Sequence, residues 1–447
     1  MKDITDGWKP SLAENAFRWL YSFLLALVIP FAFANLVIRG NKRNSEYNRR
    51  RFERFGFVLP PKAPHGYLFH CVSVGEVVAA SVLIKKIMRE EPDTAITITT
   101  TTPTGSARVR DIFKDAVHHF YLPYDLHMAM AGMLRRVKPK MVVITEVELW
   151  PNLIHSCWRR QIPVVVANAR MTTRSAKRYK KVSLLFSPML HKIDHVCAQG
   201  KRDYDNYLYL GIAERKLTLT NNIKFDQASN VEGLPPVSWG LTKGTRPVII
   251  GGSTHDGEEV ALLTCYQHLQ STYPSLLLIL VPRHPERFNA VKQLLINTGI
   301  KLVCSSSGQC VDKNTQVFLI DEMGKLNHAY GLADIAFVGG SLAERGGHNA
   351  LEPAARQLPI IMGPHTYNNP VICQYLQEKG ALVIVHDQQT LTRQCDMWLK
   401  NPQSAKSAGE AGYAVLQANR GAVNTTAEIM RMSSGCTTNG RRDDKLH

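Results

Sequence analysis

The sequence predicts an α/β protein with two domains of parallel β-sheet covered by helices, and an apolar helix before them. Three observations support this architecture. The chain has 447 residues, more than one compact core usually holds. Short, almost continuously apolar segments alternate with helical ones, as expected of parallel strands buried on both faces. A polar segment rich in proline and glycine, residues 226–246, interrupts this alternation and indicates an interdomain linker.

The first predicted element is a membrane anchor with a basic flank, residues 1–55. Residues 19–38 carry no charge, and as a helix they measure about 30 Å, close to the hydrocarbon thickness of a bilayer. The positive-inside rule places the flank on the cytoplasmic side. A single span with the body on the cytoplasmic side is favoured, and a helix lying in the membrane interface is the alternative. The basic residues of the flank are Arg39, Lys42, Arg43, Arg49, Arg50, Arg51 and Arg54.

Residues 56–225 form the predicted first domain. Apolar runs that begin at Tyr67, Thr94, Met141 and Ile162 are its predicted strands, and a helix that opens near Gly75 follows the first of them. The pattern of strand, helix and strand indicates a Rossmann-like domain.

Residues 247–432 form the predicted second domain, which repeats the same pattern. The predicted strands of this domain begin at Pro247, Leu276, Lys301, Val317, Ile335, Pro359 and Leu382. The residues after it, 433–447, are polar and predicted to be disordered.

Composition restricts the possible partners and the compartment. The formal net charge of +17 indicates an anionic partner: nucleic acid, an anionic membrane surface or a phosphorylated substrate. Nine cysteines are scattered without zinc-site spacing, which is typical of buried thiols in a reducing compartment. No GxxxxGK[ST] sequence is present, so ATP hydrolysis is not expected.

Glycine-rich segments after two strands are candidate phosphate loops, because backbone N–H groups at helix starts bind anions. The candidates are Gly252 and Ser253 after one strand and Gly340 and Ser341 after another. Arg283 also follows a strand. It either pairs with a phosphate or belongs to a surface turn held by two prolines, and the sequence favours neither.

Carboxylates at strand ends are candidate catalytic groups. Glu76 begins a helix directly after the first strand; it is either a general base or an acid that complements the helix dipole. Glu146 and Glu148 flank another strand end, and a metal pair there lacks an evident third ligand. Glu352 either caps its own helix or binds a ribose. The acidic triplet at Asp203 lies on a helical stretch and is discounted as a metal site.

With these residues considered, the sequence closely resembles the 3-deoxy-D-manno-octulosonic acid (Kdo) transferases of Gram-negative bacteria. The resemblance runs from the anchor to about residue 420. It rests on an ordered series of segments: SVGE, TTTTPTGS, YLPYDL, ELWPN, ANAR, IKFD, STHDGEE, LVPRHPERF, AFVGGSLAERGGHN and MGPHTYN.

This resemblance implies a GT-B architecture, in which two Rossmann-like domains face a cleft. It implies an inverting transfer of Kdo from CMP-Kdo to lipid IVA or Kdo-lipid IVA in lipopolysaccharide synthesis, with no metal and no cofactor. The implied location is the bacterial inner membrane, with the catalytic domains on the cytoplasmic side against the phospholipid surface. Nucleic acid is not an expected partner.

The resemblance also implies roles for individual residues. Glu76 matches the catalytic base, and Glu146 and Lys224 match residues that stabilise the transition state. One departure is Lys325, where the family commonly has an acid. The matched CMP-binding residues are Pro282, Arg283, Met323, Gly324, Lys325, Asn349, Ala350, Leu351 and Glu352.

Three alternatives are weighed beside this hypothesis. A transferase that uses a UDP-sugar shares the fold but should lack the series of segments. A sugar-nucleotide epimerase has the same two halves but needs no anchor. A non-catalytic protein that binds anionic lipid explains the charge and the anchor, and leaves Glu76 and the glycine-rich segments without a role.

Overall fold

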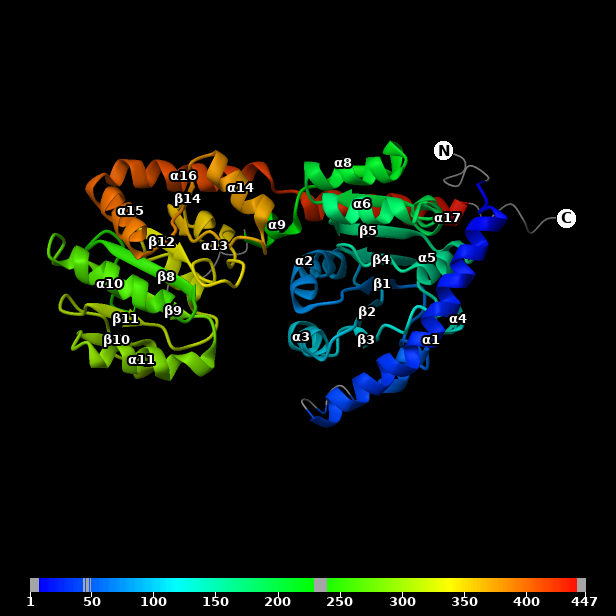
Figure 1. Cartoon of the computed structure of the whole chain (residues 1–447), viewed down its shortest axis with the longest axis horizontal. Helices are drawn as coiled ribbons and strands as arrows, with labels where there is room; N and C mark the ends of the chain where they lie inside the picture. Colours follow the sequence, from blue (N-terminus) through cyan, green and yellow to red (C-terminus); the bar gives the residue numbers. More distant parts are fainter. Residues whose placement is uncertain (1–7, 43–44, 46–47, 49, 229–238, 440–447) are drawn as a thin grey trace. The chain divides into compact units, whose positions relative to one another are not determined.

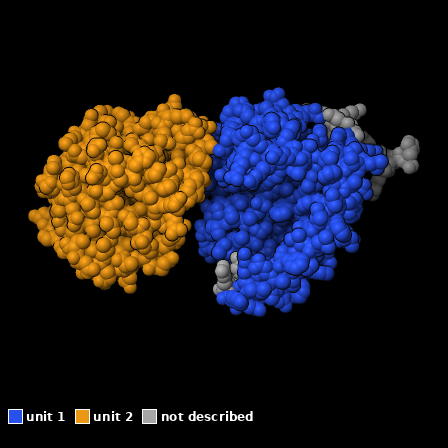
Figure 2. Space-filling model, in the orientation of Figure 1, with its two compact units in different colours: residues 1–227, 420–447 blue, residues 228–419 orange. Residues whose placement is uncertain are grey.

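The computed structural model describes residues 8–42, 45, 48, 50–228 and 239–439. The chain divides into two compact units (Figure 2). Unit 1 contains residues 1–227 and 420–447, and unit 2 contains residues 228–419.

Unit 1 is built on a sheet of seven parallel strands in the order β3-β2-β1-β4-β5-β6-β7. The strands are β1 Tyr67–His70, β2 Ile96–Thr100, β3 His118–Tyr121, β4 Met141–Thr145, β5 Val164–Ala169, β6 His195–Ala198 and β7 Leu217–Leu219. The helices are α1 Leu12–Lys42, η2 Arg51–Phe55, α2 Val74–Glu90, α3 Pro103–Phe113, α4 His127–Val137, α5 Pro151–Trp158, α6 Thr173–Lys181, α7 Ser183–His191, α8 Lys201–Leu210, η3 Glu214–Lys216, α9 Ile223–Ala228 and α17 Ala422–Asn439.

Alternate residues of these strands enter two separate cores, because successive side chains of a strand point to opposite faces of a sheet. In β4, Val142 and Ile144 pack into one core, and Met141 and Val143 pack into the other. The continuous apolar runs are therefore explained by burial on both faces. β3, β6 and β7 were not predicted, since they are short and β3 and β6 begin with histidine.

Unit 2 repeats the architecture with seven parallel strands in the order β10-β11-β9-β8-β12-β13-β14. The strands are β8 Val248–Thr254, β9 Leu277–Pro282, β10 Leu302–Cys304, β11 Val317–Leu319, β12 Ile335–Val338, β13 Ile360–Met362 and β14 Leu382–Ile384. The helices are α10 Glu258–Gln270, η5 Pro285–Arg287, α11 Phe288–Asn297, η6 Ser305–Ser307, α12 Leu326–Tyr330, α13 Leu351–Ala355, α14 Pro370–Glu378, α15 Gln388–Lys400 and α16 Pro402–Ala418.

The last helix corrects the predicted domain boundary at residue 432. α17 crosses back to unit 1 and packs against α2, β5 and β6 (Figure 1). Its apolar residues, Val423 and Met430 among them, complete one of the two cores of unit 1. The Asp226 carboxylate accepts the N–H groups of Gly421 and Val423, at 2.8 and 2.9 Å. Residues 433–439 continue this helix; the rest of the predicted disordered tail lies outside the described residues.

The predicted linker is also shorter than residues 226–246. Its first residues end α9, and residues 229–238 lie outside the described residues. Its last part belongs to unit 2: the Trp239 ring lies 5.4 Å from that of Phe318, and Leu241 is buried in the same core. Leu241 is thus a core residue and Trp239 packs against the same core, which the proline and glycine content of the segment obscured.

α1 is long and apolar enough to cross a membrane by its length and composition, yet it lies along unit 1 against α5 and α7 (Figure 1). Its contacts with the domain are partly polar. Arg18 Nη1 donates to Asn152 Oδ1 at 3.0 Å, and Asn152 Nδ2 donates to Ser22 Oγ at 2.9 Å. The Tyr21 hydroxyl donates to Asp125 at 3.2 Å. The opposite face of α1 is apolar and exposed, with Phe23, Leu24, Leu27, Val28 and Phe31.

Candidate active site

Glu76 lies at the carboxyl end of β1, in the first turn of α2. The carboxylate is held from three sides. The Val72 N–H donates to Oε2 at 2.8 Å, the Thr145 hydroxyl lies 3.1 Å from Oε2, and the Ser73 hydroxyl donates to Oε1 at 3.1 Å. Only 8% of Glu76 is exposed, and burial, opposed by the Val72 N–H and reinforced by the charge of Glu146, raises the pKa of the carboxyl to about 7. Such a group is matched to proton transfer near neutral pH.

Glu146 directly follows β4 in a strained conformation. Its φ of 57° lies in the left-handed region, which is uncommon for a residue other than glycine. Its N–H donates to Ala167 O of β5 at 3.0 Å, and its carbonyl accepts the Arg170 N–H at 3.3 Å, so the neighbouring strand maintains the conformation. Strain of this kind is concentrated at functional sites.

Lys224 lies in the first turn of α9, and two asparagines fix this turn. Asn168 Oδ1 accepts the Ile223 N–H at 3.1 Å, and Asn222 Oδ1 accepts the Lys224 N–H at 3.0 Å. Burial lowers the pKa of Lys224, whereas the nearby charge of Glu146 raises it. Glu146 and Lys224 are therefore an interacting pair of opposite charge.

The topology explains why Glu76 and Glu146 lie close together. The chain moves outward from β1 through β2 to β3, then returns to the other side of β1 and continues through β4 to β7. Beyond the carboxyl ends of β1 and β4 the connections run in opposite directions, which is where such sheets bind ligands. Glu76 follows β1 and Glu146 follows β4, so both lie at this switch point. In unit 2 the corresponding switch point lies between β8 and β12.

The predicted phosphate loop at Gly340 and Ser341 is occupied by a side chain of the protein, which corrects that prediction. The Glu258 carboxylate, in a residue 1% exposed, accepts five backbone N–H groups at 2.8 to 3.1 Å. An acid at the start of α10 thus fills the anion position that the glycines create. The donors are His255, Gly340, Ser341, Leu342 and Ala343.

The other predicted phosphate loop, Gly252 and Ser253, belongs to β8. A Cβ on Gly252 would lie 2.1 Å from the Tyr330 hydroxyl oxygen, so glycine is required there for packing within the domain. Ser253 lies at a bulge in the pairing of β8 with β9 and has a φ of 55°. This segment therefore lies at the end of the strand rather than after it, and its binding of phosphate stays a prediction.

The predicted CMP-binding residues follow three strands of unit 2 at the carboxyl edge of the sheet. Pro282 ends β9 and Arg283 follows it, exposed; Met323, Gly324 and Lys325 follow β11; and Asn349 to Glu352 follow β12. Just before α13, Asn349 Oδ1 accepts the Leu351 N–H at 3.2 Å. Burial raises the pKa of Glu352, and the charge of Arg283 is among the effects that lower it.

The acidic segments at Asp203 and Glu148 are those considered as metal sites from the sequence. Asp203 lies on α8, is fully buried and accepts the Met171 N–H at 2.7 Å, which gives it a structural role. Burial and the charge of Glu146 raise the pKa of Glu148. Across the part of the chain that the structure describes, no three histidine, cysteine, aspartate or glutamate side chains are placed to hold a metal ion.

Comparison with known proteins identifies the chain. The family model described as 3-deoxy-D-manno-octulosonic-acid transferase (kdotransferase) matches residues 49–227, and that of glycosyl transferases group 1 matches residues 302–415. The 3-deoxy-D-manno-octulosonic acid transferase of Haemophilus influenzae is 41% identical over 421 residues, covering 93% of this chain and 98% of that protein. This chain belongs to the Kdo transferase family. The Bordetella pertussis transferase is 28% identical over 92% of the chain and 98% of its own length.

Solved structures of low identity confirm the fold of this Kdo transferase. Acinetobacter baumannii MurG has a TM-score of 0.52 at 12% identity, over 83% of this chain and 100% of that one. A putative UDP-N-acetylglucosamine 2-epimerase from Listeria monocytogenes has a TM-score of 0.54 at 12% identity, over 86% and 99%. The GT-B type of two Rossmann-like domains is confirmed. The protein is a glycosyltransferase, so the non-catalytic alternative is set aside.

The sequence did not indicate every residue that positions the site of the transferase. Thr145 and Asn168 were not predicted, although Asn168 lies within the segment ANAR and Thr145 stands three residues before ELWPN. Glu258 lies in the segment STHDGEE, which carries the resemblance, but no role was predicted for it. Its role depends on a contact with a loop more than 80 residues away, which no local pattern shows.

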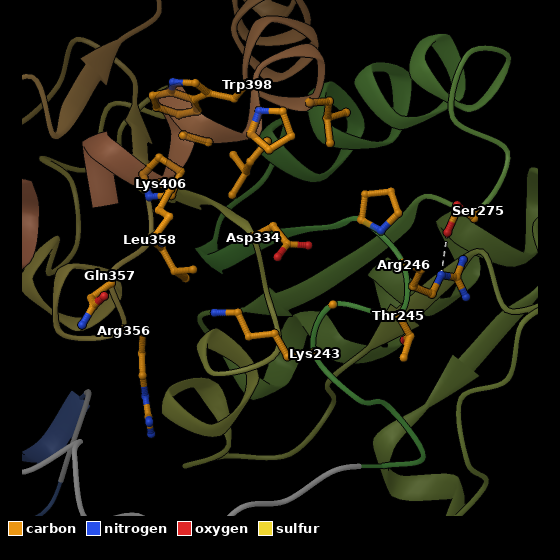
Figure 3. A pocket seen from close by; sticks show the side chains of 17 residues that line it. Lys243, Thr245, Arg246, Ser275, Asp334, Arg356, Gln357, Leu358, Trp398 and Lys406 are labelled. Atoms are coloured by element: carbon orange, nitrogen blue, oxygen red, sulfur yellow. Dashed lines mark hydrogen bonds between the residues drawn. The ribbon is translucent and has the colours of Figure 1, made fainter. Parts of the chain in front are cut away.

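A pocket of about 640 Å³ in unit 2 lies at the opposite edge of the sheet, where β8, β12 and β13 begin (Figure 3). Asp334 and Arg246 line it and are engaged: Asp334 accepts the Val248 N–H at 2.9 Å, and Arg246 donates to backbone carbonyls, including that of Ser275. These contacts fix the strand starts of the transferase. Because ligands of such sheets bind at the carboxyl edge, we assign the pocket no role in transfer.

We expect Glu258→Ala to destabilise the Kdo transferase by about 3–5 kcal/mol, because five N–H groups lose their acceptor at a largely buried position. Glu258→Gln should also destabilise it, since an amide nitrogen would face N–H donors. Urea unfolding measures the change. Glu344→Gln, an exposed acid in the same loop, is the control. Equal stability of Glu258→Ala and the control would contradict this role.

Proposed function

We propose that the protein transfers Kdo from CMP-Kdo to lipid IVA or Kdo-lipid IVA in lipopolysaccharide core synthesis, with Glu76 as general base and inversion at the anomeric carbon. The observation that carries this proposal is the buried Glu76 carboxylate at the switch point of unit 1, whose pKa lies near neutrality beside Glu146 and Lys224. Family membership supports the choice of sugar.

In the proposed reaction the Glu76 carboxylate takes the proton of a glucosamine hydroxyl of the acceptor. Its oxygens keep lone pairs beyond those used by Val72, Ser73 and Thr145. The hydroxyl oxygen bonds to the anomeric carbon as the bond to the phosphate oxygen breaks, through a transition state with oxocarbenium character. Lys224 and Arg283 stabilise developing negative charge, and this scheme requires neither a metal nor a cofactor.

Glu76→Gln should reduce transfer at least about a hundredfold, because the amide cannot accept the hydroxyl proton. In the unaltered enzyme kcat/KM should fall about tenfold for each pH unit below 7, as Glu76 becomes protonated. The assay uses CMP-Kdo and tetraacylated lipid A precursor, with products weighed by mass spectrometry. Glu90→Gln, at the exposed far end of α2, is the matched control.

The melting temperature of Glu76→Gln distinguishes loss of the base from misfolding of the variant. The folded pKa of Glu76 lies above its unfolded value of 4.5, so the folded state holds an extra proton between about pH 4.5 and 7. Its contribution to stability therefore declines as the pH rises through this window. At pH 8 the Gln variant should melt no lower than the unaltered protein. Full transfer by this variant would remove the base role from Glu76, and no transfer by the unaltered enzyme would overturn the function.

We infer that α1 holds the enzyme at the inner membrane from the cytoplasmic side, lying in the interface rather than crossing. Contacts with unit 1 are distributed along the apolar stretch: Arg18 and Ser22 bond to Asn152, Ile29 is buried, and the Phe33 ring lies 5.2 Å from that of Phe55. A crossing helix would have to break them. The exposed apolar face instead suits the interface, as do the basic residues in the last turn.

Leu24→Glu combined with Leu27→Glu should weaken binding to anionic phospholipid vesicles at least about tenfold, since two exposed leucines lose their apolar burial in the membrane. Vesicle sedimentation measures this, and Val260→Glu, an exposed residue of unit 2, is the control. A reporter fused to the N-terminus should stay on the cytoplasmic side; a periplasmic reporter would show that α1 crosses the membrane.

A further inference from the structure

Two histidines flank the switch point of the sheet in unit 2. His255 follows β8 and His348 lies in the long connection after β12. Their Nε2 atoms are 2.8 Å apart, and the two ring planes are parallel within 2°. At this distance one imidazole donates and the other accepts, so the neutral pair contains a single bridging hydrogen. Both rings are half-buried and thus accessible to a ligand.

The pair is held in place from both sides. The His255 N–H donates to the Glu258 carboxylate at 2.9 Å, and the His348 N–H donates to Gly339 O at 3.0 Å. Gly340 has a φ of 70°, and a Cβ there would lie 3.0 Å from the His348 ring. The loop that Glu258 binds therefore also supports His348. Contacts in the connections that follow β8 and β12 therefore hold the two rings in position.

Positive groups surround the pair. Arg283, Arg287 and His284 act on His255 from the connection after β9, and Arg345 acts from the connection after β12. The nearby acids are engaged elsewhere. Glu258 binds backbone N–H groups, Asp256 and Glu259 pair with Arg287 at 3.0 Å, Glu286 lies 3.9 Å from His284, and Glu352 accepts the Asn349 amide at 3.3 Å.

This environment opposes a second proton on the pair. Burial first, then the charges of His255, Arg283 and His284, lower the pKa of His348 to about 4; burial and neighbouring cations also lower the pKa of His255. A bound anion would reverse the charge effect and favour protonation. The pair thus has the properties of a site that gains a proton only when an anion is bound.

We propose that His255 and His348 bind the phosphate of the cytidine nucleotide, and that the pair takes up one proton when this anion binds. The inference rests on the proposed function, because it assigns these residues to the donor site. During transfer the bond between the anomeric carbon and the phosphate oxygen breaks, and its electron pair stays on that oxygen. The protonated pair donates a hydrogen bond to the resulting phosphate dianion. The proton of the acceptor hydroxyl goes to Glu76.

The test is calorimetric titration of the full-length protein with CMP in several buffers that differ in ionisation enthalpy, which counts the protons exchanged. At about pH 8 a phosphate monoester is already a dianion, so it contributes little to the count. We expect uptake approaching one proton for each CMP bound, and none with cytidine. His255→Gln and His348→Gln should each abolish the uptake and weaken CMP binding about tenfold.

His268→Gln, an exposed histidine near the far end of α10, is the control and should keep the uptake. Two independent variants are used so that misfolding of one, detected by its melting temperature, leaves the other. CMP binding without proton uptake, or with uptake that persists in both variants, would overturn this inference and leave the proposed function standing. No CMP binding by the unaltered protein would overturn both.

Discussion

The reversal of strand order beside the first strand of each sheet is the constraint on which the rest of the molecule depends. Parallel strands end at one edge, and only where consecutive connections diverge do two strand ends leave room for a ligand. In unit 1 this place lies between β1 and β4, and in unit 2 between β8 and β12. Residues distant in the sequence, such as Glu76 and Glu146 or His255 and His348, lie close together because of this topology.

The two switch points have opposite electrostatic character. In unit 1 two carboxylates and Lys224 share a partly buried region, so their charges influence one another and the pKa of Glu76 approaches neutrality. At the switch point of unit 2 the charged groups are mainly arginines and histidines. The buried Glu258 carboxylate there accepts hydrogen bonds from backbone N–H groups. In the proposed reaction the carboxylates of unit 1 would accept the proton and the cationic groups of unit 2 would bind the phosphate.

Much of this arrangement was predictable from the sequence. Continuous apolar runs indicated eleven of the strands, and the resemblance to Kdo transferases indicated Glu76 and Lys224. The predicted phosphate loop at Gly340 was wrong, because a glycine that permits close approach does not say whether a ligand or the protein itself approaches. Phosphate binding at Gly252 stays a prediction. The boundary at residue 432 was wrong, because an amphipathic helix does not reveal which of two cores it completes.

The return of α17 to unit 1 has a consequence for biogenesis. The chain leaves unit 1 after residue 227, builds all of unit 2, and contributes the last piece of unit 1 only from residue 420. Until these residues have left the ribosome, the part of the first core that receives Val423 and Met430, beside α2, β5 and β6, lacks this cover. Unit 1, although synthesised first, therefore matures last, and its nascent form exposes apolar surface for as long as the remaining half of the polypeptide is being made.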